Sequence, residues 1–159
     1  MRATGAVLIL VSAATYLLSA FRMQQKQEKL VQDILDAIEQ IATLIRWENR
    51  TLPDSIEHQT QRGSAGQYFE NVTQFLKGGT PLQVAWNNVF STIEPGEIST
   101  ILCGVLLSGD SAFLQARFSN AAEQIRAFQR MTQEKQRERQ KLRMALTLSG
   151  AGLVVILLL

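Results

Sequence analysis

Two apolar segments without any charged side chain stand at the ends of this 159-residue chain. They cover residues 3–21 and residues 144–159. As helices they would extend roughly 28 and 24 Å, which approaches the hydrocarbon thickness of a lipid bilayer, about 30 Å. We therefore expect membrane-spanning helices at residues 3–21 and 142–159, with Leu142 and a snorkelling Arg143 completing the shorter second span.

Each apolar segment also has a simpler interpretation. The first could be a cleaved signal peptide, because Arg2 precedes an apolar stretch, although its exit "LLSAFRMQQ" lacks a small-x-small cleavage site. The second could be a terminal helix buried in a soluble core, although "GLVVILLL" is apolar on every side and offers no polar face to water. The membrane interpretation accounts for both segments together.

Basic side chains flank both apolar segments on the sides that face the middle of the chain. Arg22, Lys26 and Lys29 follow the first segment. Four more lie before the second: Arg137, Arg139, Lys141 and Arg143. The positive-inside rule therefore places the middle of the chain in the cytoplasm. A net charge of only +2, with the basic residues beside the apolar ends, favours lipid headgroups over nucleic acid as their partner. A specific binding site is the alternative to this solvated lipid anchor.

The central part of the chain carries helical periodicity. Apolar side chains recur at alternating steps of three and four in two long seams, which are Val31, Ile34, Ile38, Ile41 and Ile45, and then Leu114, Phe118, Ala121, Ile125 and Phe128. Polar segments at residues 22–29 and 132–141 separate these seams from the apolar ends. Because the two polar segments lie at matching depths, we expect solvated stalks on an antiparallel pair of terminal helices.

Capping signals predict shorter helices between the two seams. Thr51 is a candidate N-cap for a helix around Ile56. Ser64 with Gln67 has the pattern of a capping box, and the helix that follows would stop at the glycine pair of residues 78–79.

Two further elements are expected before the second seam. Thr80, Pro81 and Gln83 have the composition of a helix start. The run "ILCGVLL", residues 101–107, is apolar on every side, and we interpret it as a central buried helix in which Gly104 allows a close backbone approach. Gly109 would end it, with Asp110 or Ser111 as the next N-cap.

The expected fold class is therefore all-α. An antiparallel helical bundle at residues 30–131 would lie in the cytoplasm, flanked by N- and C-terminal transmembrane helices on polar stalks. We expect no catalytic, metal or cofactor site. His58 is the one histidine and has no acidic or cysteine cluster at ligand spacing, and Cys103 has no activating base at helical spacing.

Two kinds of residue remain as candidate partner contacts. Asp33, Asp36 and Glu39 repeat at every third position, which is typical of a solvated helix face or of a contact for a basic partner. Trp47 and Trp86 are either core residues or interaction hot spots.

The order of motifs along the chain resembles the stage III sporulation protein AB family. The similar segments are "GAVLILVSAATYLLS", "LIRWENRTLP", "YFENVTQFLKGG", the pair Ala85-Trp86, "LLSGDSAFLQ" with Gly109, Asp110 and Gln115, and "KLRMALTLSGAGLVVILLL". Two details depart from the family pattern. The turn here reads Thr51-Leu52-Pro53, and Gly109 stands directly before Asp110 rather than in a Leu-Gly pair shortly before the aspartate.

The resemblance implies a function that residue spacing alone does not. The family is similar in its helical domain to the inner-membrane platform protein of type II secretion and type IV pilus machines. It would belong to a channel complex between the mother cell and the engulfed forespore. The chain would then sit in the mother-cell membrane around the forespore, dock a secretion-type ATPase encoded by the same operon on its cytoplasmic domain, and contact the other membrane subunits of the channel.

Within that hypothesis the second apolar segment offers a packing face. Ser149, Gly150 and Gly152 are small residues of the kind that let membrane helices approach closely, although glycines are frequent in membrane helices in general. Self-association of the chain is left open. Two other functions stay as alternatives: a tail-anchored extracytoplasmic scaffold with a cleaved leader, and a general secretion or pilus platform.

Overall fold

The computed structural model describes the backbone of residues 2–48 and 50–158 and the side chains of residues 22–48 and 50–138. Every regular element within these ranges is an α-helix, so the expected all-α class is confirmed. The helices are α1 (Arg2–Trp47), α2 (Leu52–Glu57), α3 (Gly66–Lys77), α4 (Leu82–Phe90), α5 (Gly96–Cys103) and α6 (Ser111–Leu158).

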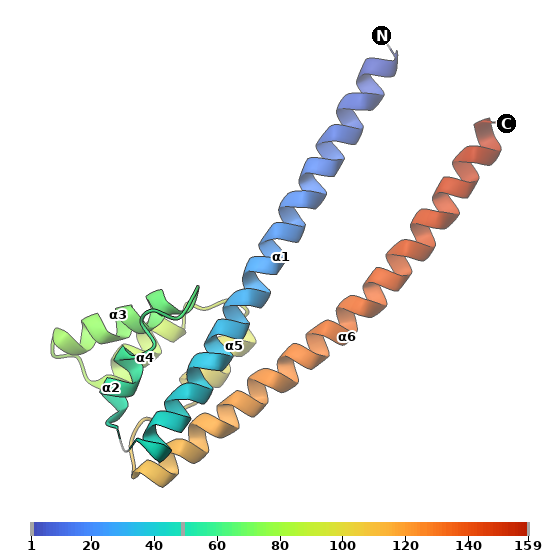
Figure 1. Cartoon of the computed structure of the whole chain (residues 1–159). Helices are drawn as coiled ribbons and strands as arrows, with labels where there is room; N and C mark the ends of the chain where they lie inside the picture. Colours follow the sequence, from blue (N-terminus) through green and yellow to red (C-terminus); the bar gives the residue numbers. More distant parts are fainter. Residues whose placement is uncertain (1, 49, 159) are drawn as a thin grey trace.

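The two long helices form the axis of the molecule. α1 and α6 pack against each other in opposite directions, and the four short helices lie against them at one end of the pair (Figure 1). From that bundle α1 and α6 continue in the same direction, toward the two chain ends (Figure 1). The antiparallel pair that the two polar segments predicted is therefore present.

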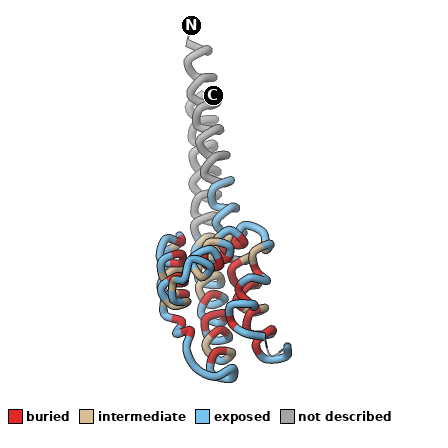
Figure 2. The backbone as a smooth tube through the Cα atoms, turned by 90° about the vertical axis from the view of Figure 1, so that its left-hand side faces the viewer, coloured by how far each residue is buried: buried red, intermediate tan, exposed pale blue. Residues whose placement is uncertain are grey.

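The hydrophobic core lies between the long helices and the layer of short helices (Figure 2). Both predicted seams point into it. Of the first seam, Ile34, Ile38 and Ile41 have no exposed surface. Of the second, Phe118 and Ile125 are equally buried. A period of 3.6 residues places such positions on one side of a helix, so burial of that side drives the pairing.

Aromatic rings fill the centre of this core. Trp86 is completely buried, and its ring centroid lies 4.2 Å from that of Phe90 and 5.9 Å from that of Phe118. The indole Nε1 donates a hydrogen bond of 2.9 Å to the carbonyl oxygen of Leu102. The polar atom of the indole is thereby satisfied inside the core, which a buried tryptophan requires. Trp86 is a core residue and not a surface hot spot.

Two of the predicted helix caps are confirmed. The Thr51 hydroxyl accepts from the backbone N–H of Asp54 at 3.4 Å and begins α2. The carboxylate of Asp110 accepts from the backbone N–H of Phe113 at 2.7 Å and begins α6. Each cap satisfies one of the free N–H groups in the first helical turn.

The predicted capping box at Ser64 is wrong. Ala65 occupies the N-cap of α3 and makes no side-chain capping bond. The backbone N–H and the hydroxyl of Ser64 instead both donate to the Asp33 carboxylate, each at 2.7 Å. Gly63, with φ of +47°, turns the chain onto α1 at this point, and a Cβ at Gly63 would collide with that carboxylate. A tertiary contact has replaced the local cap.

The helix start predicted around residues 80–83 is correct in position, but the glutamine acts differently. Pro81 is the N-cap of α4 and no side chain caps this helix. The Gln83 side chain reaches across to a segment 22 and 24 residues further on. Its Nε2 donates to the Val105 carbonyl at 3.1 Å, and its Oε1 accepts from the Leu107 N–H at 2.8 Å.

The central buried helix expected at residues 101–107 is also wrong. α5 ends at Cys103, and residues 105–108 are not helical. Val105 and Leu107 are buried while Leu106 is 49% exposed, which is the alternation of an extended segment. The Gln83 amide forms hydrogen bonds with the Val105 carbonyl and the Leu107 N–H, which in a helix would bond to other backbone groups. The close backbone approach predicted at Gly104 is also absent. The nearest neighbours of a Cβ placed there are the carbonyl oxygens of Thr100 and Ile101 in the preceding helix.

Within the part of the chain whose side chains are described, no helix contains a stretch that is both long enough and apolar enough to cross a bilayer. The expected spans at residues 3–21 and 142–159 lie outside that part. Inside it, residues 22–29 are all exposed, as a polar stalk would be.

Candidate functional site

Among the places on the described surface where a partner could bind, three involve both α1 and α6. The first, which we call the neck cleft, lies between α1 and α6 beside Pro95 of the loop that precedes α5. Its volume is about 480 Å³. Val31 and Phe128 contribute apolar surface, and seven glutamines line it: Gln24, Gln25, Gln27, Gln32, Gln129, Gln133 and Gln136. A hydrogen bond of 3.1 Å from Gln129 Nε2 to Gln32 Oε1 joins the two helices here.

The second place, the outer groove, is a shallow trough of about 250 Å³ between α1 and α6. Its lining residues are Glu39, Ala42, Thr43, Arg46, Trp47, Gln115, Ser119, Ala122, Glu123 and Arg126. An ion pair of 2.6 Å between Arg126 and Glu39 crosses it. Both side chains are partly exposed, at 49% and 37%, so the pair itself adds little to stability.

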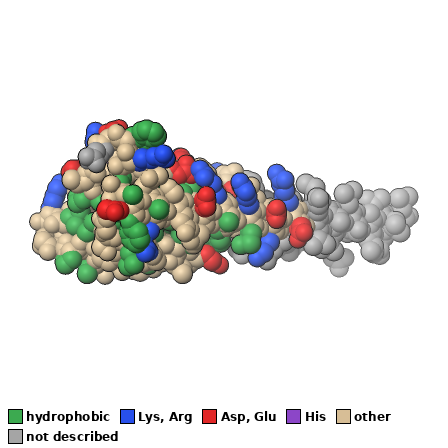
Figure 3. Space-filling model, turned by 90° about the horizontal axis from the view of Figure 1, so that it is seen from below, with side chains coloured by type: hydrophobic (Ala, Val, Ile, Leu, Met, Phe, Trp, Pro, Cys, Tyr) green, Lys and Arg blue, Asp and Glu red, His purple; other side chains and the backbone are tan. Residues whose placement is uncertain are grey.

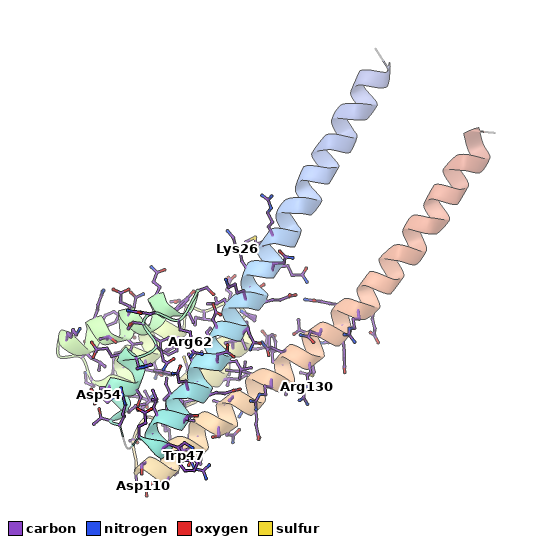
Figure 4. All side chains as sticks on the ribbon, viewed as in Figure 1. Lys26, Trp47, Asp54, Arg62, Asp110 and Arg130 are labelled. Atoms are coloured by element: carbon purple, nitrogen blue, oxygen red, sulfur yellow. The ribbon has the colours of Figure 1, made fainter. Side chains whose placement is uncertain are left out.

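The third place, the distal tip, is the end of the α1–α6 pair opposite the chain ends. Figure 4 labels Trp47 and Asp110 at this end, where α1 stops and α6 begins. Trp47 is 73% exposed and Phe113 is 44% exposed. An arginine lies over each ring, Arg46 at 4.8 Å from the Trp47 ring centre and Arg117 at 4.3 Å from that of Phe113. Tryptophan and arginine together are typical of interaction hot spots.

The three acidic residues predicted as a partner contact have different surroundings. Asp33 receives the two hydrogen bonds from Ser64 and holds the loop before α3. Glu39 pairs with Arg126 of α6. Asp36 accepts a hydrogen bond of 2.8 Å from Gln32 of the same helix. The partner contact stays a prediction, but Asp33 already has a structural role, so only Asp36 and Glu39 remain candidates.

The four family-like residues have distinct positions. Trp86 is in the core and Gln115 lines the outer groove. Gly109 has φ of +132°, and a Cβ there would lie 2.7 Å from the Phe113 ring, so glycine allows the turn that leads into the Asp110 cap. Phe113 and Arg117 lie next to this motif, but the sequence interpretation did not select them. Their spacing of four residues on a helix would have been the signal.

Other predicted residues lie at the surface or beyond the described side chains. Arg137 is exposed on α6. The remaining candidates for lipid or membrane-helix contacts lie outside the part that the structure describes: Arg139, Lys141, Arg143, Ser149, Gly150 and Gly152. Figure 3 shows Lys, Arg, Asp and Glu side chains following the long helices away from the bundle, toward that part.

Groups that could carry chemistry are sparse among the described residues. No group of three or more His, Cys, Asp and Glu side chains is arranged there to hold a metal ion. His58 is exposed. Cys103 is half-buried, with its Sγ 3.9 Å from the Asn87 carbonyl oxygen.

The geometry defines a class of protein: an all-helical chain in which two long antiparallel helices carry a layer of short helices at one end. The family model described as stage III sporulation protein AB matches residues 2–159. The chain therefore belongs to the stage III sporulation protein AB family, as the resemblance predicted, and the family implies a role in sporulation. Neither the curated proteins nor the solved structures contain a match to it.

Proposed function

We propose that this chain is a non-enzymatic platform subunit of the channel complex that connects the mother cell with the forespore. It is attached to the mother-cell membrane by helices at residues 3–21 and 142–159, and its helical bundle lies in the cytoplasm. A secretion-type ATPase docks on the bundle, and the terminal helices contact the other membrane subunits. No cofactor takes part. The family supports the sporulation role over that of a general secretion or pilus platform.

One observation carries this proposal. α1 and α6 run antiparallel and leave the bundle in the same direction (Figure 1), so the apolar segments at both chain ends follow from the same side of the bundle. A protein attached to one membrane at both termini needs this arrangement. The exposed residues 22–29 separate the bundle from the first apolar segment, and basic side chains on both helices suit anionic headgroups.

The distal tip is the surface we assign to the ATPase. It is the end of the bundle farthest from the proposed membrane, so a large cytoplasmic partner can reach it without contacting lipid. Trp47 and Phe113 provide exposed aromatic surface, and Arg46 and Arg117 provide donors for acidic or carbonyl groups of the partner.

Co-purification of the full-length chain with the ATPase of its operon tests the docking surface. Trp47→Ala combined with Phe113→Ala should reduce recovery of the ATPase by roughly tenfold or more, as loss of hot-spot aromatics does. A matched control is Phe75→Ala with Val84→Ala, because these side chains are 43% and 47% exposed but belong to α3 and α4. Equal loss in both double variants would contradict docking at the distal tip.

Reversing the charges of Asp36 and Glu39 tests, in the same assay, the acidic partner contact that the sequence predicted on α1. If ATPase recovery falls there and not with the aromatic variant, the docking surface is the acidic face.

N-terminal sequencing of the chain isolated from membranes tests the topology. An intact start at Met1 or Arg2 agrees with two retained spans. A start near Phe21 would mean that the first segment is a cleaved leader, and the extracytoplasmic scaffold would replace the platform as the proposed function.

A further inference from the structure

The outer groove lies on a face of the α1–α6 pair whose charges are opposite on the two helices. The bond between Glu39 and Arg126 shows that these two residues lie at the same level along the pair. One turn further toward the chain ends, α1 presents Asp36 and α6 presents Arg130, three and four residues away from the bonded pair. This part of the face is therefore acidic on α1 and basic on α6.

Toward the distal tip the signs reverse. Arg46 of α1 and Glu123 of α6 both line the outer groove. From the chain ends toward the distal tip, α1 thus presents two acidic residues and then a basic one. Over the same length α6 presents two basic residues and then an acidic one. Arg130 makes no ion pair and no hydrogen bond among the side chains that the structure describes, and Asp36 bonds only with Gln32 of its own helix there. Charged side chains on this face therefore remain free to form ion pairs with another molecule.

Such a face is complementary to a second copy of itself. A two-fold axis parallel to the long helices places α1 of one copy against α6 of the other at the same level. Asp36 and Glu39 then oppose Arg130 and Arg126 of the second copy. An axis across the helices places α1 on α1 and α6 on α6 instead. At the level of these four residues, such an axis sets Asp36 and Glu39 against the same acidic residues of the second copy, and Arg126 and Arg130 against its arginines.

The shape of the groove agrees with this pairing. Ala42, Ser119 and Ala122 are small side chains on the wall of the groove, so helices of a second copy can approach closely.

We propose that the outer α1–α6 face binds a second copy of this chain, with α1 of each copy packed against α6 of the other in a four-helix arrangement. The two-fold axis runs along the helices, so the terminal ends of both copies point the same way. Only this last consequence relates to the proposed function, since two copies in one membrane must be oriented alike. The charge pattern stands without it.

Charge exchange in the full-length chain tests the pairing. Two differently tagged copies are expressed together, extracted in mild detergent and purified through one tag. One variant carries Asp36→Lys and Glu39→Lys, and another carries Arg126→Glu and Arg130→Glu. Each gives the facing parts of α1 and α6 the same sign, so recovery of the second copy should fall by about tenfold or more. A chain with all four substitutions restores opposite signs between α1 and α6 and should recover most of the wild-type association.

The control reverses Glu70 and Glu97 to lysine, since both are exposed but belong to α3 and α5. It should leave recovery unchanged. A wild-type chain that stays monomeric by light scattering in detergent overturns the proposal, as does a four-substitution chain that fails to associate while retaining wild-type helicity. Because no ATPase is present, failure here leaves the docking surface at the distal tip unaffected, and failure of that docking leaves the self-association unaffected.

Discussion

The bundle around Trp86 and the neck between α1 and α6 are built from the same two long helices but differ in how these are held. In the bundle, the seams of α1 and α6 pack on a layer of short helices, and rings such as Phe90 and Phe118 contact the buried Trp86. In the neck, residues 22–29 are all exposed and glutamines line the space between the helices. The hydrophobic effect thus stabilises one region, while the other depends on helix propensity and a few amide bonds.

This contrast separates stability from interaction. Substitutions in the bundle should unfold the chain. Substitutions at the neck, the outer groove and the distal tip should leave it folded and change what it binds. The two tryptophans represent the two cases, since Trp86 has no exposed surface and Trp47 is 73% exposed.

The largest effect is expected at Trp86. Trp86→Ala removes the central ring and the indole hydrogen bond to the Leu102 carbonyl, so the free energy of unfolding should fall by about 3–5 kcal/mol. Trp47→Ala should change it by no more than about 0.5 kcal/mol, because that ring is at the surface. Urea unfolding of the full-length chain in detergent, followed by circular dichroism, measures both. Similar losses in the two variants would contradict the division into a stabilising bundle and an interacting surface.

A smaller effect is expected at the distal tip, where Asp110 begins α6. Asp110→Ala removes the acceptor for the Phe113 N–H and should cost about 1 kcal/mol in the same unfolding measurement. Asp110→Asn keeps an acceptor oxygen at the N-cap and should cost clearly less. If the asparagine variant is as unstable as the alanine variant, the cap is not the reason that α6 begins there.

The parts of the fold that follow from local rules were predictable from the sequence. The isoleucine seam of α1 follows from periodicity, and the caps at Thr51 and Asp110 follow from the short range over which a side chain reaches the first helical turn. The distal tip was only partly predictable. Trp47 was selected as a candidate, but its exposure depends on where the chain turns after α1.

The errors all have tertiary causes. Ser64 has the composition of a cap, but its donors bind Asp33, which is 31 residues away. The run at residues 101–107 has no period, and its last part is extended because Gln83 supplies its backbone bonds from α4. A pattern of neighbouring residues in the sequence cannot predict these long-range hydrogen bonds. The neck cleft was missed for a similar reason, since its glutamines are unremarkable until α1 and α6 are paired.

The smallest effect on stability, and the one most specific to the neck, is expected at Gln129. Gln129→Ala removes the bond from Nε2 to Gln32 that joins α6 to α1, but both side chains reach solvent, so the free energy of unfolding should change by at most about 0.5 kcal/mol. Local opening should respond more, because few other contacts hold this region, and amide hydrogen exchange around residues 129–136 should become faster. Gln124→Ala is the matched control, since it loses a bond to Asn120 within α6 only. Faster exchange in the control as well, or an effect that extends to the amides around Trp86, would show that the neck and the bundle open as one unit.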